Sequence, residues 1–70
     1  MSTTLTEERL AALEHEVLEY LREHDSITNR KLREFAGVSY DQAIFFFNQM
    51  LDRGVLQRAG VSSGIRYVLP

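Results

Sequence analysis

The sequence predicts an α+β fold in which three helices precede a two-stranded antiparallel hairpin. Apolar residues recur at three- and four-residue steps in the first part of the chain, which is typical of helices packed on a core. Near the C-terminus, apolar and polar residues alternate on one side of a Gly-rich loop, which is typical of a hairpin. The 70 residues allow one domain, spanning 1–70, with a core only just large enough to offset the chain entropy lost on folding. We therefore expect a marginal monomer or a dimer.

The first helix is expected over about 7–24. The hydroxyl of Thr6 can cap it, and the two glutamates that follow suit the positive end of the helix dipole. One stripe of apolar side chains marks the face toward the core: Leu10, Leu13, Val17, Tyr20 and Leu21. Leu18 and Ala11 form a second apolar edge, for which simple exposure and contact with a partner subunit both stay open. After the helix, Ile27 is expected as a buried plug or a one-residue strand.

The second helix is expected over about 29–36. Thr28 precedes it and can cap its free N–H groups. Leu32 and Phe35 are expected to point inward. Gly37 then stands where the helix must end in a left-handed residue, a conformation that glycine adopts without steric cost.

The third helix is expected over about 40–53 and is followed by Gly54. Ser39 and Gln42 have the spacing of a capping box, in which each side chain binds the backbone N–H of the other residue. One arc of the helix is apolar and is expected to be buried: Ala43, Phe46, Phe47, Met50 and Leu51. Phe45 falls on the opposite, otherwise polar side; cover by a protein partner or a second subunit, cover by DNA, and a misjudged helix phase all stay open.

The hairpin is expected to pair residues 55–58 with residues 65–69 through a loop over 60–64. Side chains alternate between the two faces of a strand, so Tyr67 is expected to pack while Arg66 projects outward.

Four short segments carry a family resemblance: Ser26-Ile27-Thr28-Asn29-Arg30, Gly37-Val38-Ser39, Arg53-Gly54-Val55-Leu56 and Gly64-Ile65-Arg66-Tyr67-Val68-Leu69. They resemble the winged helix-turn-helix superfamily, and in particular the C-terminal winged-helix domains of RecG-like helicase-related transcriptional regulators. The resemblance implies that the third helix enters the major groove of DNA. It also implies that the start of the second helix contacts phosphate and that the hairpin, the wing, contacts the backbone or the minor groove.

Charge is distributed unevenly along the chain, although the net charge is only -2. Residues 1–25 hold seven acidic and two basic side chains, whereas residues 26–70 hold six basic and three acidic ones. This asymmetry is expected if one side of the domain faces phosphate and the other faces solvent. For the first helix alone, a solvated acidic face explains the pattern equally well.

The candidate DNA-binding residues form two groups. Base contacts are expected from the third helix, where amides can pair with adenine and apolar groups can meet a thymine methyl: Tyr40, Gln42, Ile44, Phe45 and Asn48. Backbone contacts are expected from the second helix and the hairpin: Asn29, Arg30, Lys31, Arg58, Ser63 and Arg66. These residues predict a partner in double-stranded DNA and a role in transcriptional control or in targeting a DNA-processing system.

The third helix also supports a different interpretation. Its exposed face has no Lys or Arg before Arg53, and it carries carboxylates that repel phosphate. A protein-interaction or dimerisation surface built on Ile44 and Phe45 is the alternative.

Catalysis and cofactor chemistry find no support in the sequence. There is no cysteine, and His15 and His24 lack a second metal ligand at a suitable spacing, so we expect no enzyme activity, metal or cofactor. No small-molecule substrate is evident. No signal segment is visible and no apolar run approaches the roughly 20 residues that span a bilayer, which favours a cytoplasmic protein without a membrane partner.

Overall fold

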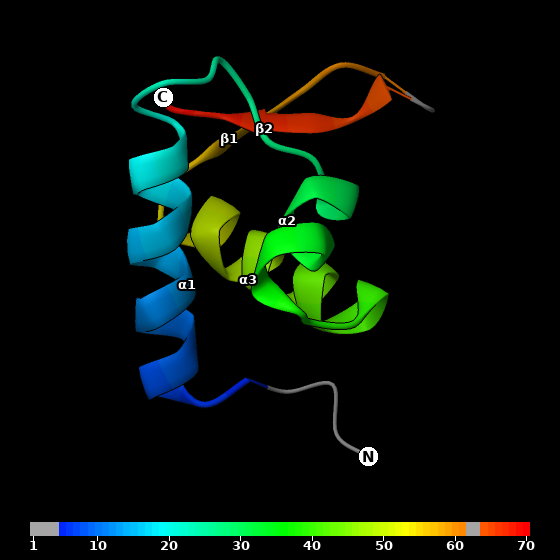
Figure 1. The fold of residues 1–70 in the computed structure, drawn as a ribbon. Helices are drawn as coiled ribbons and strands as arrows, with labels where there is room; N and C mark the ends of the chain where they lie inside the picture. The colour runs from blue at the N-terminus through cyan, green and yellow to red at the C-terminus, as the bar shows by residue number, and fades with distance from the viewer. Residues whose placement is uncertain (1–4, 62–63) are drawn as a thin grey trace.

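The computed structural model describes residues 5–61 and 64–70. Within these residues the elements follow in the order α1 (Glu7–Tyr20), α2 (Asn29–Ala36), α3 (Tyr40–Asp52), β1 (Gln57–Ala59) and β2 (Arg66–Val68). The two strands form an antiparallel sheet, so the predicted α+β layout of three helices and a C-terminal hairpin is confirmed (Figure 1).

The three predicted helix starts are all confirmed. The hydroxyl of Thr6 accepts from the N–H of Arg9 at 3.1 Å, and the hydroxyl of Thr28 accepts from the N–H of Lys31 at 3.1 Å. Ahead of α3, Ser39 and Gln42 form the reciprocal capping box. Each cap satisfies N–H groups that have no partner within the helix, which fixes where the helix begins.

The end of α1 differs from the prediction. The helix ends at Tyr20 with Leu21 as its cap, four residues before the expected boundary. The N–H groups of Arg22 and Glu23 bind carbonyls only three residues back, each at 3.2 Å. Such bonds tighten the last turn and end the α-helical ladder.

The turn between α2 and α3 follows the prediction. Gly37 has a φ of 70° and donates its N–H to the carbonyl of Arg33. Its neighbour Ala36 accepts a second bond at its carbonyl, from the guanidinium of Arg9 at 2.8 Å. The end of α2 is therefore tied both to its own backbone and to α1.

Strand β1 begins later than predicted, at Gln57, because the preceding backbone closes α3. Gly54 has a φ of 73° and its N–H binds the carbonyl of Leu51, while the N–H of Val55 binds the carbonyl of Met50. This pair of bonds is a Schellman motif, which caps the last carbonyls of the helix. The residues expected to open the strand are therefore used to end the helix.

Strand β2 pairs on both of its edges. On one side the register is Gln57 with Val68, Arg58 with Tyr67 and Ala59 with Arg66. On the other side Tyr67 exchanges two backbone bonds with Ile27, at 2.9 and 2.8 Å. Ile27 is thus both buried and a one-residue strand, so it meets both alternatives that the sequence left open, and it ties the hairpin to the segment between α1 and α2.

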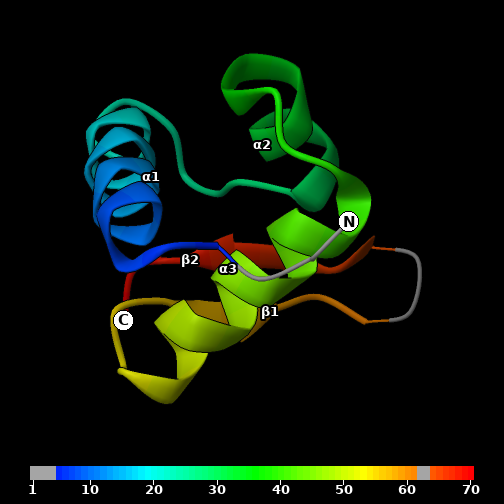
Figure 2. The same cartoon turned by 90° about the horizontal axis from the view of Figure 1, so that it is seen from below.

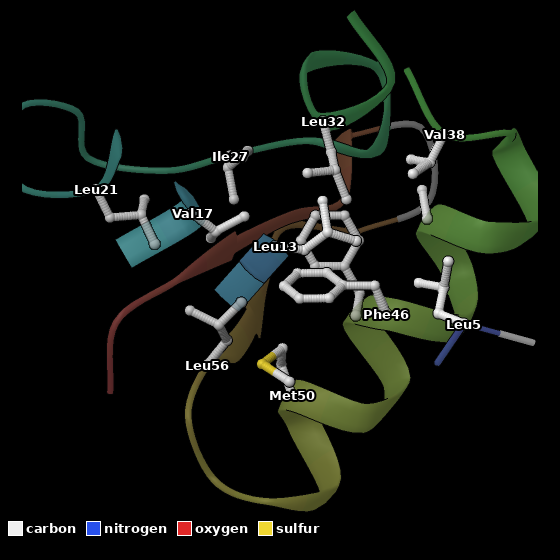
Figure 3. Packing of buried hydrophobic residues seen from close by; sticks show 12 residues of the cluster. Leu5, Leu13, Val17, Leu21, Ile27, Leu32, Val38, Phe46, Met50 and Leu56 are labelled. Atoms are coloured by element: carbon white, nitrogen blue, oxygen red, sulfur yellow. The ribbon is translucent and has the colours of Figure 1, made fainter. Parts of the chain in front are cut away.

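The core lies between the helices and the hairpin (Figure 3). Its buried side chains are Leu5, Leu13, Val17, Leu21, Ile27, Leu32, Val38, Ala43, Phe46, Phe47, Met50 and Leu56. These include eight of the twelve helical positions expected to face the core; Leu10, Tyr20 and Leu51 are half-buried, and Phe35 is exposed. Leu5, which precedes α1, belongs to the core as well, although its position outside any periodic stripe gave no signal.

Two predicted aromatic positions are corrected. Phe45 is half-buried and packs against the core, because the core extends around α3 beyond the single arc that a helical projection assigns. Phe35 is 42% exposed rather than inward-facing, because Leu32 fills the inner side of the short α2 and Phe35 stacks sideways on Tyr20, with ring centroids 5.7 Å apart.

The helices and the hairpin occupy different parts of the molecule. Helices α1 and α2 both lie on the same side of α3 in the view from below (Figure 2). The hairpin lies across one end of the helices and extends past α3 on the side away from α1 (Figure 1).

Over residues 5–61 and 64–70, no helix has the length and apolarity that a membrane crossing requires.

Candidate nucleic-acid interface

A groove of about 370 Å³ separates α3 from the hairpin. It is lined by residues of α2, α3 and both strands or their flanks: Asn29, Tyr40, Ile44, Asn48, Arg58, Ile65 and Tyr67. The first five are residues that the sequence assigned to DNA contact. The fold therefore brings together side chains that are up to 38 positions apart in the chain (67 against 29).

The α3 wall of the groove is one stripe of side chains. Tyr40, Ile44 and Asn48 follow at four-residue steps, which places them on one face of the helix. Tyr40 is 56% exposed and Ile44 is 36% exposed. Asn48 is also exposed, and its amide makes no hydrogen bond to any residue that the structure describes. The stripe thus offers an aromatic ring, a branched apolar group and a primary amide to a ligand.

Gln42 and Phe45 lie outside this stripe. The side-chain oxygen of Gln42 accepts from the N–H of Ser39 at 3.0 Å, so the capping box uses the acceptor that a paired adenine contact would need. Phe45 packs against the core. The two roles predicted for Gln42, cap and base contact, therefore compete for the same atom.

The hairpin wall is organised by Tyr67. Its ring stacks on that of Phe47, with centroids 3.9 Å apart and planes at 6°. Because the N–H and carbonyl of Tyr67 bind Ile27, the pair of Tyr67 with Arg58 lacks mutual backbone bonds, the arrangement in which opposite side chains come closest. Arg58 therefore lies beside Tyr67 on the face of the hairpin that meets α3.

Arg66 lies on the other face of the hairpin. It precedes Tyr67 in β2 and pairs with Ala59, and neighbouring residues of a strand point to opposite faces. Arg58 and Arg66, which the sequence grouped together, are thus separated by the hairpin itself. Ser63 lies outside the described residues.

The phenol of Tyr67 stays neutral at physiological pH. Burial raises the pKa of Tyr67, an effect that the charge of Arg58 partly offsets and that Tyr40 reinforces. A neutral phenol both donates and accepts hydrogen bonds, so it can serve either type of group on a ligand.

One end of the groove lies at the starts of α2 and α3. The amide of Asn29 donates to the carbonyl of Tyr40 at 3.4 Å, and its oxygen accepts from the Nε of Arg33 at 2.7 Å. The guanidinium carbon of Arg33 in turn lies 5.4 Å from the centre of the Tyr40 ring. These interactions fix the position of Tyr40 and place the positive charge of Arg33 near its ring.

Three residues of this site were missed by the sequence assignment of DNA contacts: Arg33, Ile65 and Tyr67. Ile65 and Tyr67 share one face of the second strand, which the alternation already showed. Arg33 follows Asn29 by four positions on a helix, a spacing at which side chains meet.

Arg30 and Lys31 are neighbours at the start of α2, but their side chains have different surroundings. Both bind Glu34, with Arg30 Nε and Lys31 Nζ each 3.3 Å from one of its oxygens, and the hydrogen bond and charge of Lys31 are the main reason that the pKa of Glu34 is lowered. The side chain of Arg30 is 82% exposed, and such exposed pairs are weak, so it can exchange Glu34 for a phosphate. Lys31 instead lines a second groove, between α1 and α2.

Arg53 and His24 do not line the α3–hairpin groove. Arg53 binds Glu14 of α1 at 2.8 Å. His24 stacks on Tyr20, with centroids 4.0 Å apart. In the part of the chain that the structure describes, no cluster of three or more His, Asp or Glu side chains could hold a metal ion.

No family model, no curated protein and no solved structure matches this chain. The residues of the groove and their geometry are therefore the basis for assigning a function.

Proposed function

We propose that this chain is a cytoplasmic winged helix-turn-helix domain that binds double-stranded DNA through the α3–hairpin groove. One observation carries the proposal: five residues assigned to DNA contact from the sequence line the same groove. Its biological role is then transcriptional control or the targeting of a DNA-processing system.

In this proposal the exposed stripe of α3 enters the major groove. The amide of Asn48, which binds none of the described residues, can pair with adenine, and Ile44 can contact the methyl group of thymine. Tyr40 lies at the start of the helix, where side chains of a recognition helix meet base edges or phosphate. A helix of 13 residues is about 20 Å long, which is long enough to cross the major groove.

Backbone contacts come from the cations that flank the groove. Arg58 lies on the hairpin side, Arg30 on the α2 side and Arg66 on the outer face of the hairpin. Seven of the ten acidic side chains lie in residues 1–25, so the net charge of -2 does not describe the surface around the groove. Asp41 and Asp52 are exposed on α3 and oppose phosphate, so we expect modest, strongly salt-dependent affinity.

The same groove also favours a second candidate, a protein or peptide ligand. Tyr40, Ile44 and Ile65 are exposed apolar side chains at one site, and such patches mark interaction surfaces. Phe45 no longer supports this candidate, because it packs against the core.

Chemical-shift mapping with isotope-labelled protein and a mixed-sequence duplex tests the proposal. We expect the shifts to gather at Asn29, Tyr40, Ile44 and Asn48, and to leave the middle of α1 unchanged. Replacement of Arg58 by Ala should weaken binding to all sequences alike. The matched control is Arg22→Ala, which removes the same charge from an exposed side chain of the second groove.

Two results would contradict the proposal. If duplex DNA leaves the shifts of the groove unchanged, or if Arg22→Ala weakens binding as much as Arg58→Ala, the α3–hairpin groove is not the DNA site. The protein-ligand candidate then takes its place.

A further inference from the structure

The α3 wall of the α3–hairpin groove has an apolar side chain between two polar ones. Ile44 lies one helical turn after Tyr40 and one turn before Asn48, and all three line the groove. Ile44 is 36% exposed. An exposed Ile at the centre of a polar stripe gains stability when a ligand brings an apolar group against it.

The base edges in the major groove of DNA offer one apolar group of this kind, the C5-methyl of thymine. The other groups that distinguish the bases there are hydrogen-bond donors and acceptors. If Ile44 covered one of these, the polar group would lose its water without gaining a hydrogen bond, which opposes binding. The apolar centre of the stripe therefore favours a methyl group over every other base edge.

Asn48 supplies the amide that is available to a base. Among the described residues, two primary amides line the groove, those of Asn29 and Asn48. The amide of Asn29 donates to the carbonyl of Tyr40 and accepts from the Nε of Arg33, so both of its ends are used within the protein. The amide of Asn48 binds none of the described residues. A primary amide pairs with both N6 and N7 of adenine.

Helix α3 has no side chain of the kind that recognises guanine best. Arg and Lys donate to O6 and N7 of guanine, and the sequence from Tyr40 to Asp52 contains neither. Arg58, the cation that lines the groove, belongs to β1 and not to α3. A helix that presents an amide and an apolar group without a cation favours A·T over G·C pairs.

We propose that the DNA bound in the α3–hairpin groove is A·T-rich and is selected through the C5-methyl group of a pyrimidine. Ile44 contacts this methyl group, and Asn48 pairs with an adenine. The two residues are about 6 Å apart along α3 and base pairs are stacked about 3.4 Å apart, so the two contacts fall one or two base pairs from each other. This inference rests on the proposed function, because it names the class of DNA that the same groove binds.

The contact of Ile44 is with the methyl group and not with thymine as a whole. 5-Methylcytosine carries a methyl group at the same edge of the major groove, so Ile44 responds to it as well. Uracil keeps the hydrogen-bonding groups of thymine and lacks the methyl. These two bases allow the methyl group and the type of base pair to be varied separately.

Four alternating copolymer duplexes test the inference: dA-dT, dA-dU, dG-dC, and dG with 5-methyl-dC. Each contains a single type of base pair, so every position along the DNA offers the same contacts. Affinities measured by fluorescence anisotropy at about 50 mM salt should rise roughly fourfold with the methyl group in both types of base pair, the effect of covering one methyl group. With the methyl group present in both, the A·T duplex should bind at least about fivefold more tightly than the G·C duplex.

Variants of exposed residues assign each preference to a side chain. Ile44→Ala should abolish the methyl effect and keep the preference for A·T, whereas Asn48→Ala should keep the methyl effect and reduce the preference for A·T. The matched control is Ile65→Ala, which removes the same type of side chain, 38% exposed, from the hairpin wall and should keep both preferences. Far-UV circular dichroism confirms that each variant is folded.

The inference and the proposed function fail in different ways. Equal affinity for the four duplexes, or a preference for G·C, would overturn the inference and leave DNA binding in place. A methyl effect that persists in Ile44→Ala would also overturn it, because the methyl group would then act through the shape of the DNA. Loss of the effect in Ile65→Ala would assign it to the wrong wall. Absence of binding to all four duplexes would overturn both proposals.

Discussion

The capping box of α3 makes a prediction that separates a structural role of Gln42 from a role in reading DNA. Gln42→Ala removes the oxygen that accepts from the N–H of Ser39 at 3.0 Å but keeps the reciprocal bond from its own N–H to the Ser39 hydroxyl. Loss of one such bond costs about 0.5–1.5 kcal/mol, and the better helix propensity of Ala returns a few tenths of that. We expect the free energy of unfolding to fall by roughly 0.5–1 kcal/mol.

The assay is thermal unfolding followed by circular dichroism. For a domain of this size each kcal/mol shifts Tm by about 4–8 °C, so Gln42→Ala should lower Tm by about 2–8 °C. Gln42→Glu is the matched control, because Glu also completes a capping box and suits the positive end of the helix. Asn48→Ala, at an exposed position of the same helix, should change stability by less than about 0.5 kcal/mol.

DNA binding completes the comparison. Asn48→Ala should relax discrimination at one A·T pair, by about 1–3 kcal/mol, whereas Gln42→Ala should leave base preference unchanged. If instead Gln42→Ala left Tm unchanged and relaxed base preference, the side chain would be reading DNA, and the assignment of its oxygen to the cap would be refuted.

Three further predictions concern stability. Gly37→Ala should cost about 1–2 kcal/mol in urea unfolding, because a Cβ meets nothing within 4 Å and only the left-handed backbone opposes it; an unchanged midpoint would contradict the φ of 70°. Leu5→Ala should cost about 2 kcal/mol, because this side chain is buried in the core; a neutral effect would remove the segment before α1 from the core. Tyr67 has a raised pKa when folded, so its contribution to stability should persist below its ordinary pKa near 10 and be lost as the pH rises through the folded pKa. Urea unfolding between about pH 8 and 11 should show this loss, and Tyr67→Phe should abolish it; identical pH profiles for the two chains would refute the assignment.

Local signals predicted the three helix starts well because each start depends on neighbouring residues. Thr6, Thr28 and Ser39 cap the three helices because their hydroxyls reach N–H groups only a few positions away. Gly37 follows the same logic at the end of α2. Such interactions join residues that lie close together in the sequence.

Two errors arose where distant segments decide the outcome. Phe45 is half-buried because the core is wider than one helical arc, and Leu5 joined that core without any periodic signal. Strand register likewise comes from tertiary contacts. Two other errors are local: the start of β1 was placed too early because the N–H of Val55 caps α3, and the end of α1 was placed four residues too late.

The candidate site was also only partly predictable from the sequence. Five of its residues were identified by type and by element, but the sequence could not show that Lys31 turns toward α1 while Asn29 turns toward α3. Arg58 and Arg66 were grouped by proximity in the hairpin, and only the pairing of Arg58 with Tyr67 separates their faces. Residue types predicted the chemistry, and the packing of α2 and the hairpin decided which groups share a groove.

Binding to a mixed-sequence duplex against salt is the most direct test of the central claim. If Arg30, Arg58 and Arg66 each neutralise one phosphate, the log–log slope should be about -2.7, and affinity should fall roughly 40-fold between about 50 and 200 mM salt. Arg58→Ala should reduce the slope by about 0.9. Absence of binding at the lowest salt, or an affinity independent of salt, would contradict the account and identify the α3–hairpin groove as a surface for a protein ligand.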